Sequence, residues 1–252
     1  MMHNKAEIKT LAIIPARSNS KRVPGKNLKK LGQTPLFVYT LLAALQCDEV
    51  DLVCLTTESN DIEEVAIRYA KQIGKLDKLD IVHRAMYLTM DHVQLDEVVT
   101  AALRQYELNG YNIETVVVLQ ATSPFRNTNH IIQALQLFKN LNKTINTIFT
   151  VEMDNGFHWN WDHETGEFSP LGHTPEKRLG GQWEWQNHSI MKENGAMYVT
   201  RADVMTHTKA FRNAPYYPFV MDSKYSVDID YPEDWNKACL LYTSDAADDL
   251  LC

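Results

Sequence analysis

Short apolar runs alternate with segments of helical period through the first 151 residues of the chain. The apolar runs have the length and composition of buried strands, and the segments between them repeat apolar residues as one face of a helix does. We expect strands at 11–16, 51–57, 79–83, 114–120 and 145–151, and helices at 34–46, 60–74, 93–108 and 129–140. Because parallel strands need crossover connections, this alternation predicts an α/β fold, with a Rossmann-like, mostly parallel sheet and helices on both faces.

Two helix ends carry specific capping signals. Thr34 is expected to cap the 34–46 helix with Pro35 at its first helical position, and Asn60 to cap the 60–74 helix, which Gly74 ends. Sheets of this kind bind ligands at the carboxyl ends of their strands. The first candidates for a site therefore directly follow strands, and they are 17–27, 56–58, Arg84 and 120–126.

This regularity is lost in residues 152–193, which carry Trp, His and Gly with little helical period. We expect them to form a small, irregular, β-rich lobe that contacts a partner subunit. Within the lobe Trp159 and Trp161, and likewise Trp183 and Trp185, are spaced as strand residues that share a face.

The last part of the chain returns to a regular pattern and then departs from it. Residues 194–201 predict a strand, and 225–238 predict a short strand and a final helix that begins near Pro232. The closing LYTSDAADDLLC resembles the translation of a sequencing adapter, so we expect a non-native tail, with a real helical tail as the alternative. The expected division is an α/β domain at 8–151 and 194–240, an inserted lobe at 152–193 and the tail at 241–252.

The charge balance narrows the class of partner. With 25 Lys and Arg against 32 Asp and Glu, the chain carries a formal charge of −7, which argues against nucleic acid or an anionic membrane as partner. The cysteines lack paired spacing, so neither a disulfide framework nor a cysteine zinc site is expected, and Cys47 and Cys54 are predicted to be buried thiols. Neither a signal peptide nor a run of transmembrane length is recognisable, and the expected location is cytoplasmic.

Positive charge is nevertheless concentrated in IIPARSNSKRVPGKN, which spans 13–27. Four cations fall within ten residues with no acid among them, and they are Arg17, Lys21, Arg22 and Lys26. A loop between a strand and a helix can bind phosphate through cations and backbone amides, although this one is not a Walker loop. Pro24-Gly25 predicts a tight turn that points Lys26 back over the strand end. Solvated surface charge is the alternative.

Two further segments offer groups for chemistry. VDID places Asp228 and Asp230 on the same side of an extended chain. They would suit Mg²⁺, which takes one or two carboxylates together with substrate phosphates; a solvated turn is the alternative. LQATSPFR ends the strongest predicted strand with Gln120, hydroxyl residues and Arg126, and there the alternative is a loop whose polar groups satisfy the backbone.

Together and in this order, IPARSNSKRVPGKN, LQATSPFR, ENGAMYV and VDIDYPED resemble the acylneuraminate cytidylyltransferases, from about Leu11 to Ala238. That family includes the CMP-sialic acid synthetases and relatives that act on legionaminic and pseudaminic acids. The resemblance implies transfer of CMP from CTP to the anomeric hydroxyl of a nine-carbon 2-keto (nonulosonic) sugar acid, with release of pyrophosphate. It also implies Mg²⁺ as cofactor, a nucleotide-binding role for the α/β domain, and a homodimer with 152–193 as its dimerisation lobe.

The resemblance also implies residue roles. The catalytic residues would be Arg17, Lys26, Asp228 and Asp230, with the two aspartates as Mg²⁺ ligands. Nucleotide contacts are expected from Ala16, Arg17, Ser20, Lys21, Lys26, Asn27 and Arg84. Contacts with the sugar acid are expected from Gln120, Thr122, Ser123 and Asn194. Lys21 would assist, and Arg22 is expected to be solvated.

The chain departs from the family pattern where Ala85 follows Arg84 in place of Pro, and where Gln94 and Leu95 replace small hydroxyl residues. The Arg-Gln pair that usually precedes N-G-A has no clean counterpart, and its candidates are Arg178, Gln182 and Gln186. Two alternatives remain open. One is a nucleotidyltransferase of the same fold that uses another sugar acid, such as the eight-carbon Kdo, or another nucleotide. The other is a non-catalytic homologue that binds a nucleotide or a sugar acid.

Overall fold

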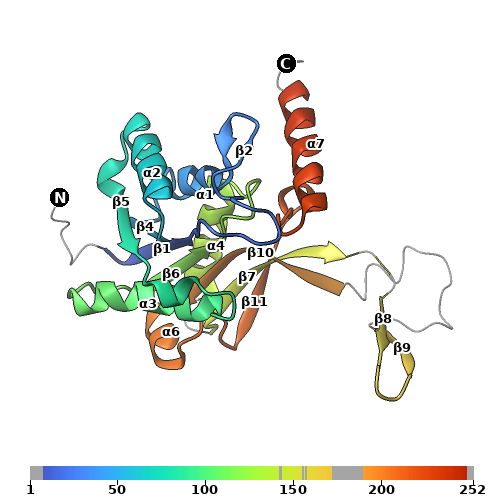
Figure 1. The fold of residues 1–252 in the computed structure, drawn as a ribbon. Helices are drawn as coiled ribbons and strands as arrows, with labels where there is room; N and C mark the ends of the chain where they lie inside the picture. Colours follow the sequence, from blue (N-terminus) through green and yellow to red (C-terminus); the bar gives the residue numbers. More distant parts are fainter. Residues whose placement is uncertain (1–7, 142–143, 155, 157, 172–189, 249–252) are drawn as a thin grey trace.

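The computed structural model describes residues 8–141, 144–154, 156, 158–171 and 190–248 (Figure 1). A seven-stranded sheet runs through the molecule in the order β11-β7-β10-β6-β1-β4-β5. Its strands are β1 (Thr10–Pro15), β4 (Leu52–Thr57), β5 (Leu79–His83), β6 (Thr115–Leu119), β7 (Thr147–Asp154), β10 (Ile190–Arg201) and β11 (Tyr216–Val220). The helices are α1 (Leu36–Leu45), α2 (Asn60–Gln72), α3 (Leu95–Leu108), α4 (Thr128–Leu141), α6 (Ala202–Thr208) and α7 (Pro232–Asp248), with short 3-10 turns η1 (Leu76–Lys78), η2 (Met86–Thr89) and η4 (Ser223–Tyr225).

The predicted α/β fold is confirmed, and the sheet is mixed. β1 pairs in parallel with β4 and β6, β4 with β5, and β7 with β11. β10 is antiparallel to both of its neighbours, β6 and β7. β11 was not expected from the sequence, because its YYPFV stretch is short, half exposed and interrupted by Pro218, as an edge strand can be.

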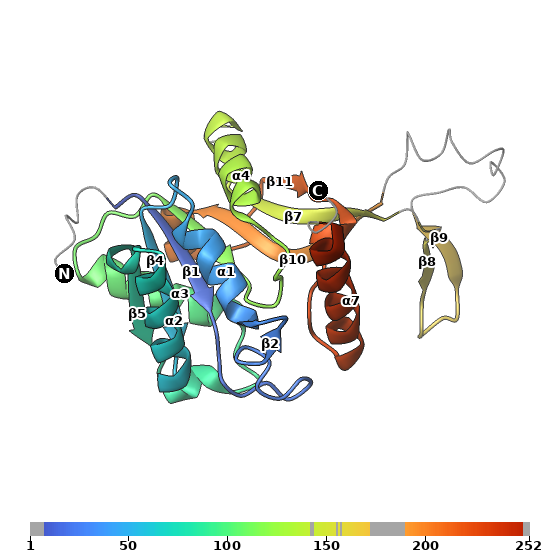
Figure 2. The ribbon, with the colours of Figure 1, turned by 90° about the horizontal axis from the view of Figure 1, so that it is seen from above.

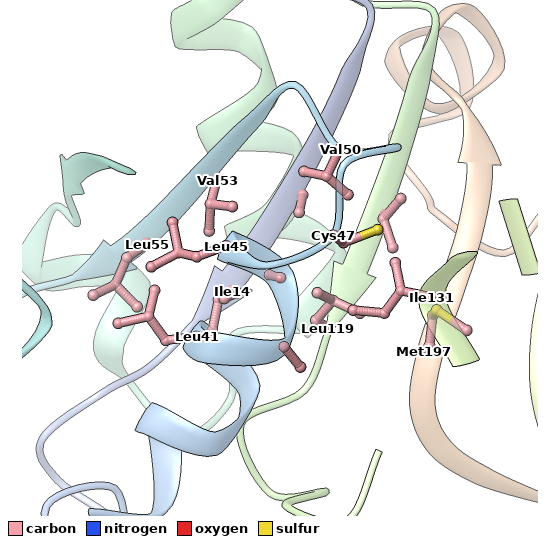
Figure 3. Packing of buried hydrophobic residues seen from close by; sticks show 14 of the residues in the cluster. Ile14, Leu41, Leu45, Cys47, Val50, Val53, Leu55, Leu119, Ile131 and Met197 are labelled. Carbon is pink, nitrogen blue, oxygen red and sulfur yellow. The ribbon is translucent and has the colours of Figure 1, made fainter. Parts of the chain in front are cut away.

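The two faces of the sheet are covered by different helices, as predicted. Ala12 and Ile14 of β1 point into a core cluster shared with α1, α2 and α4. Leu11 and Ile13 point to the opposite face, where they pack with α3 and α6. Figure 3 shows the first cluster, with side chains from several strands meeting those of α1 and α4. Alternate residues of a buried strand serve opposite faces, which explains why the strands read as continuous apolar runs.

The capping predictions need correction by one or two residues. Thr34 lies in the two-residue strand β3 (Thr34–Pro35), which pairs with β2 (Lys30–Leu31), and α1 begins after Pro35. α2 is capped by Ser59, whose hydroxyl accepts a hydrogen bond from the Ile62 amide at 3.4 Å. Gly74 follows the end of α2 with φ +66°, the left-handed conformation that glycine adopts at such ends.

The predicted lobe begins as an extension of the sheet. β7 and β10 continue outward as an antiparallel pair in which Glu152 lies opposite Lys192, so the expected divisions at 151/152 and 193/194 fall inside these strands. The hairpin of β8 (His158–Trp161) and β9 (Phe168–Leu171) stands apart from the sheet (Figure 2).

The predicted alternation of Trp159 and Trp161 is confirmed. Trp159 stacks on Phe168 with ring centroids 4.7 Å apart, and Trp161 meets the same ring edge-on. Residues 172–189, which include Trp183 and Trp185, lie outside the described residues.

The segment before α7 is extended but pairs with no strand, contrary to the expected short strand. Val227 and Ile229 are buried beside Trp235 of α7, and the Ile229 amide donates to the Thr122 carbonyl at 2.9 Å. α7 continues to Asp248, past the predicted domain end at 240. The non-native origin of 241–252 stays a prediction. Among the described residues, none of the helices has the length and apolar character needed to cross a membrane.

Candidate active site

A pocket of about 320 Å³ opens where β1, β5 and β6 end, at the edge of the sheet that the topology predicted. The predicted site residues that line it are Arg17, Ser20, Lys21, Lys26, Asn27, Arg84, Gln120, Thr122 and Asp230. Ala16, Ser123, Asn194 and Asp228 lie outside this lining. Most of the predicted set is therefore brought together from four distant segments of the chain.

Part of the pocket lining is apolar. It comes from η2 and the start of α3, and its residues are Leu88, Met90, Val93, Leu95 and Val98. The sequence placed only Val93, Leu95 and Val98 in a helix packed on the sheet, because apolar residues at a helical spacing usually mark core. The pocket lining thus combines cations with apolar side chains.

Backbone geometry shapes the basic loop. The Ala16 amide donates to the Thr56 carbonyl at 3.0 Å and so extends the pairing of β1 with β4. The Lys26 amide donates to the Val23 carbonyl at 3.2 Å, and Gly25 has φ +62°, which confirms the tight turn predicted from Pro24-Gly25.

Two side chains fix the start of this loop. The buried Asn27 amide donates to the Arg17 carbonyl at 2.8 Å. The carboxylate of Glu58, which follows β4, accepts hydrogen bonds from the amide and hydroxyl of Ser18 at 2.7 and 2.8 Å. The loop is therefore held in one shape by contacts that leave its cations to face the pocket.

Two carboxylates share the four cations of the loop. Asp91 pairs with Arg17 at 3.2 Å and with Lys21 at 2.5 Å. Asp230 pairs with Lys26 at 3.0 Å and with Arg22 at 3.1 Å.

The expectation that Arg22 is only solvated was therefore wrong. Its guanidinium also lies 4.8 Å from the centre of the Tyr231 ring, a cation–π contact. Asp91 was missed because its partners lie far away in sequence, and local spacing carries no signal of such pairing.

Lys26 is the most buried of the four cations, with 13% of its side chain exposed. Its ammonium donates to the Ile229 carbonyl at 2.7 Å and to Asp230 at 3.0 Å. The basic loop is thereby joined to the segment before α7.

Arg84 is also buried, and it donates to the Thr56 carbonyl at 2.9 Å. Burial lowers the pKa of Arg84, while nearby Glu58 opposes that change. Arg84 thus brings a largely dehydrated cation to the pocket wall.

Asp228 and Asp230 project to the same side of the extended segment, because Val227 and Ile229 fill the core on the other side. Burial raises the pKa of Asp228, and the charge of Asp230 raises it further. The hydroxyl of Thr122 lies near enough to lower the pKa in part, but Asp228 Oδ1 is buried without a partner in hydrogen-bond geometry.

These two carboxylates fit a divalent cation. A buried carboxylate oxygen without a partner, beside a second carboxylate, is the donor pair that Mg²⁺ uses together with phosphate oxygens. In the described part of the chain, no three or more His, Cys, Asp or Glu side chains are grouped around a metal position.

The raised pKa of Asp228 predicts a pH dependence of stability in metal-free protein. The folded state disfavours the charged form of Asp228. The contribution of Asp228 to the free energy of unfolding is therefore fully present below its pKa in the unfolded chain, and it is lost as pH rises through its raised pKa in the folded protein. In EDTA, Asp228→Asn should therefore unfold at a higher denaturant concentration than wild type at pH 7, and the gap should close at acidic pH. An equal gap at both pH values would contradict this prediction.

Gly195 brings Gln120 and Asp228 close together. It has φ +69°, and a Cβ at this position would lie 2.9 Å from Gln120 Nε2 and 3.9 Å from Asp228 Oδ2. Gly195→Ala should cost about 1–2 kcal/mol through left-handed strain and should also push the Gln120 amide from its position. Chemical denaturation measures the strain, and the KM for the sugar acid, which is the ligand predicted to contact Gln120, measures the displacement of the amide. Gly110→Ala, at φ +81° and with open space around it, is the matched control for strain alone.

Two of the predicted residues outside the pocket lining, Asn194 and Ser123, have buried side chains. The Asn194 amide donates to the Ser226 hydroxyl at 2.9 Å, and its oxygen accepts from the Ala196 amide at 3.1 Å. Ser123 is 1% exposed. The contacts predicted between these two residues and substrate stay predictions.

Arg126 is the largest buried polar side chain near the site. Its guanidinium donates to the Ala196 carbonyl at 3.2 Å and to the Thr40 hydroxyl at 2.7 Å, and burial lowers its pKa to about 9. It joins the end of β6 to α1 and β10, behind Gln120.

Comparisons with known proteins agree with this geometry. Residues 11–166 match the family described as Cytidylyltransferase. The chain is 29% identical over 236 residues to the CMP-N,N'-diacetyllegionaminic acid synthase of Legionella pneumophila, covering 90% of this chain and 94% of that protein. It is 31% identical to the N-acylneuraminate cytidylyltransferase of Escherichia coli over 91% of this chain, and it spans 51% of that longer protein.

Solved structures share the fold. A CMP:2-keto-3-deoxy-manno-octonic acid synthetase complexed with CTP superposes with a TM-score of 0.63 and 15% identity, over 94% of this chain and 99% of that one. The 4-diphosphocytidyl-2C-methyl-D-erythritol synthase of Anaerococcus prevotii superposes with a TM-score of 0.67 and 10% identity, over 96% of this chain and 100% of that one. The match of 11–166 covers the basic loop and the strands that carry the pocket. This chain belongs to the cytidylyltransferase family and is related to the CMP-sialic and CMP-legionaminic acid synthetases.

Proposed function

We propose that this protein transfers CMP from CTP to the anomeric hydroxyl of a nonulosonic, sialic-acid-like sugar acid and releases pyrophosphate. The observation that carries the proposal is the mixed lining of the pocket, in which the cations of the basic loop and Arg84 are combined with apolar side chains between Leu88 and Val98. A nucleoside triphosphate has a matching combination, since its phosphates are polyanionic and its base is flat and largely apolar. The similarity to a legionaminic acid synthase along almost the whole chain supports a nine-carbon acid as acceptor.

The residues of the pocket suit phosphoryl transfer. In this reaction the sugar hydroxyl attacks the α-phosphorus, a new P–O bond forms, and the bond to pyrophosphate breaks. Charge grows on the equatorial and leaving oxygens, so fixed cations lower the barrier. Arg17, Lys21 and Lys26 would contact the phosphates, with Arg84 behind them as a dehydrated charge.

The carboxylates would serve the same step. Asp228 and Asp230 would hold Mg²⁺, which when bound neutralises charge on the phosphate oxygens. Gln120 and Thr122 line the pocket at the end of β6, where they would contact the sugar acid. Ser123 and Asn194 border this region from within the fold.

A homodimer is also part of the proposal. Trp161, Phe168 and Leu171 of the β8–β9 hairpin are each more than half exposed, and a second copy of the chain would cover them. Light scattering coupled to size exclusion tests this. A dimer that Trp161→Lys converts to a monomer supports the proposal, and a wild-type monomer contradicts it.

The function is tested by pyrophosphate release from CTP and Mg²⁺ with sialic, legionaminic and pseudaminic acids, and with Kdo. We expect release with at least one nine-carbon acid. Release with Kdo alone would assign the enzyme to the eight-carbon acid. A titration with CTP, UTP, GTP and ATP then tests the base, and a preference for any nucleotide other than CTP would overturn the CTP assignment. Binding without release across all acids would favour a non-catalytic homologue.

A further inference from the structure

Asp91 occupies an unusual position in the candidate site. It lies between η2 and α3, lines the pocket, and accepts ion pairs from both Arg17 and Lys21. Arg17 also donates to the Thr89 carbonyl, at 3.3 Å. A carboxylate thus lies between two cations of the basic loop, where an anionic ligand of the pocket would be expected to bind.

The geometry distinguishes Asp91 from a carboxylate that merely stabilises the fold. Its side chain is 49% exposed, and the ammonium of its partner Lys21 is on a side chain that is 72% exposed, so neither is fixed by packing. Ion pairs this exposed contribute little to stability and are easily exchanged for another anion. The hydrogen bond from Lys21 lowers the pKa of Asp91, as expected for a carboxylate in contact with an ammonium.

The other carboxylate of the pair behaves differently. Asp230 binds Lys26, whose side chain is only 13% exposed, and its segment is anchored by buried Ile229. The four cations are therefore divided between Asp230, whose segment is anchored, and Asp91, whose side chain is more exposed (49% against 35%). An incoming polyanion would displace Asp91 first.

We propose that Asp91 competes with the phosphates of the nucleotide for Arg17 and Lys21. This competition limits nucleotide affinity and promotes release of pyrophosphate. The inference rests on the proposed function, since it concerns the same pocket. When a phosphate binds Arg17 and Lys21, their pairs with Asp91 break and the carboxylate moves away. Met90, next to Asp91, and Val93 form part of the apolar lining, so this movement also reaches the part of the pocket proposed for the base.

The test compares Asp91→Asn with wild type by calorimetric titration of CTP, inorganic pyrophosphate and cytidine, each with Mg²⁺ and with EDTA. Asparagine keeps the shape of the side chain but removes its charge. We expect CTP and pyrophosphate to bind about five- to tenfold more tightly, the effect of no longer breaking two exposed ion pairs and of removing a nearby like charge. Cytidine, which carries no phosphate, should bind unchanged. Inhibition of turnover by pyrophosphate should strengthen by the same factor.

Asp48→Asn is the matched control. Asp48 is 92% exposed, pairs with Lys75 at 3.8 Å and lies outside the pocket, so its substitution changes the net charge equally without touching the site. Asp91→Ser provides a second variant, and thermal unfolding verifies that each is folded.

The outcomes separate the two proposals. If wild type binds CTP and Asp91→Asn binds it no more tightly, Asp91 is not a competitor. Weaker binding only in Mg²⁺ would make Asp91 a ligand of the Mg²⁺ that the phosphates also bind, and would overturn the inference. If no variant binds CTP or pyrophosphate, the proposed function fails and the inference with it.

Discussion

Asp230→Ala is expected to lower turnover by about 10³-fold while leaving the fold in place. The carboxylate is the proposed partner of Asp228 in holding Mg²⁺, and it also fixes the positions of Lys26 and Arg22. The substitution therefore removes a metal ligand and frees two cations at once. Pyrophosphate release at saturating CTP, measured across a range of Mg²⁺ concentrations, gives the effect.

The fold should survive because the backbone here does not depend on the Asp230 side chain. The carboxylate of Asp234 accepts hydrogen bonds from the amides of Asp230 and Tyr231 at 3.0 and 2.7 Å, and Val227 and Ile229 remain buried. Circular dichroism should show an unchanged fold, and thermal unfolding should show a loss of about 1–3 kcal/mol, because the largely shielded Lys26 ammonium loses one of its partners. Activity near that of wild type at low Mg²⁺ would refute the ligand role, and gross unfolding would refute the claim that the segment is held by Asp234.

Lys26→Met is expected to lower kcat by about 10²-fold, with a smaller change in the KM for CTP. Methionine keeps much of the apolar stem and removes only the charge, so packing around the side chain is largely retained. The expected loss comes from a cation that is largely shielded from water, because charge–charge interactions are stronger there than at the surface. Steady-state kinetics with separate determination of kcat and KM makes the measurement.

Arg22→Met is the matched control for Lys26→Met. Both cations pair with Asp230, but the Arg22 side chain is 53% exposed and the Lys26 side chain 13%. The control should therefore lose only a few-fold in rate, in keeping with the small contribution of exposed ion pairs. Equal losses of rate in the two variants would mean that the contribution of Lys26 to catalysis does not depend on its burial.

Local rules predicted the sheet well where the strands are fully buried. β1, β4 and β6 were recognised because both faces are covered and most of their residues are apolar. β11 was missed because its exposed tyrosines and Pro218 resemble a loop. The cap of α2 was misplaced because the adjacent residues Ser59 and Asn60 are both good caps, and the choice depends on which hydroxyl or amide meets a free backbone group. The cap of α1 was misplaced because Thr34 pairs in β3 and the helix begins after Pro35 without a side-chain cap.

The candidate site was only partly predicted, because local sequence rules again identified only its local features. Pro24-Gly25 specified the turn that positions Lys26, and the period of two placed Asp228 and Asp230 on one side. Leu95 and Val98 were assigned to core because they follow a helical spacing, and only the structure shows that they also border the pocket.

The sequence by itself determined the alternation of strands and helices, the tight turn of the basic loop and the motifs that place the chain in its family. These are local properties, since they depend on the period of apolar residues and on the backbone preferences of Pro and Gly. Tertiary structure alone decided which carboxylate neutralises which cation. Arg17 meets Asp91 across 74 residues and Lys26 meets Asp230 across 204, because strand order brings distant loops to one edge of the sheet. Local spacing carries no information about such pairs, since charges interact through space and not along the chain.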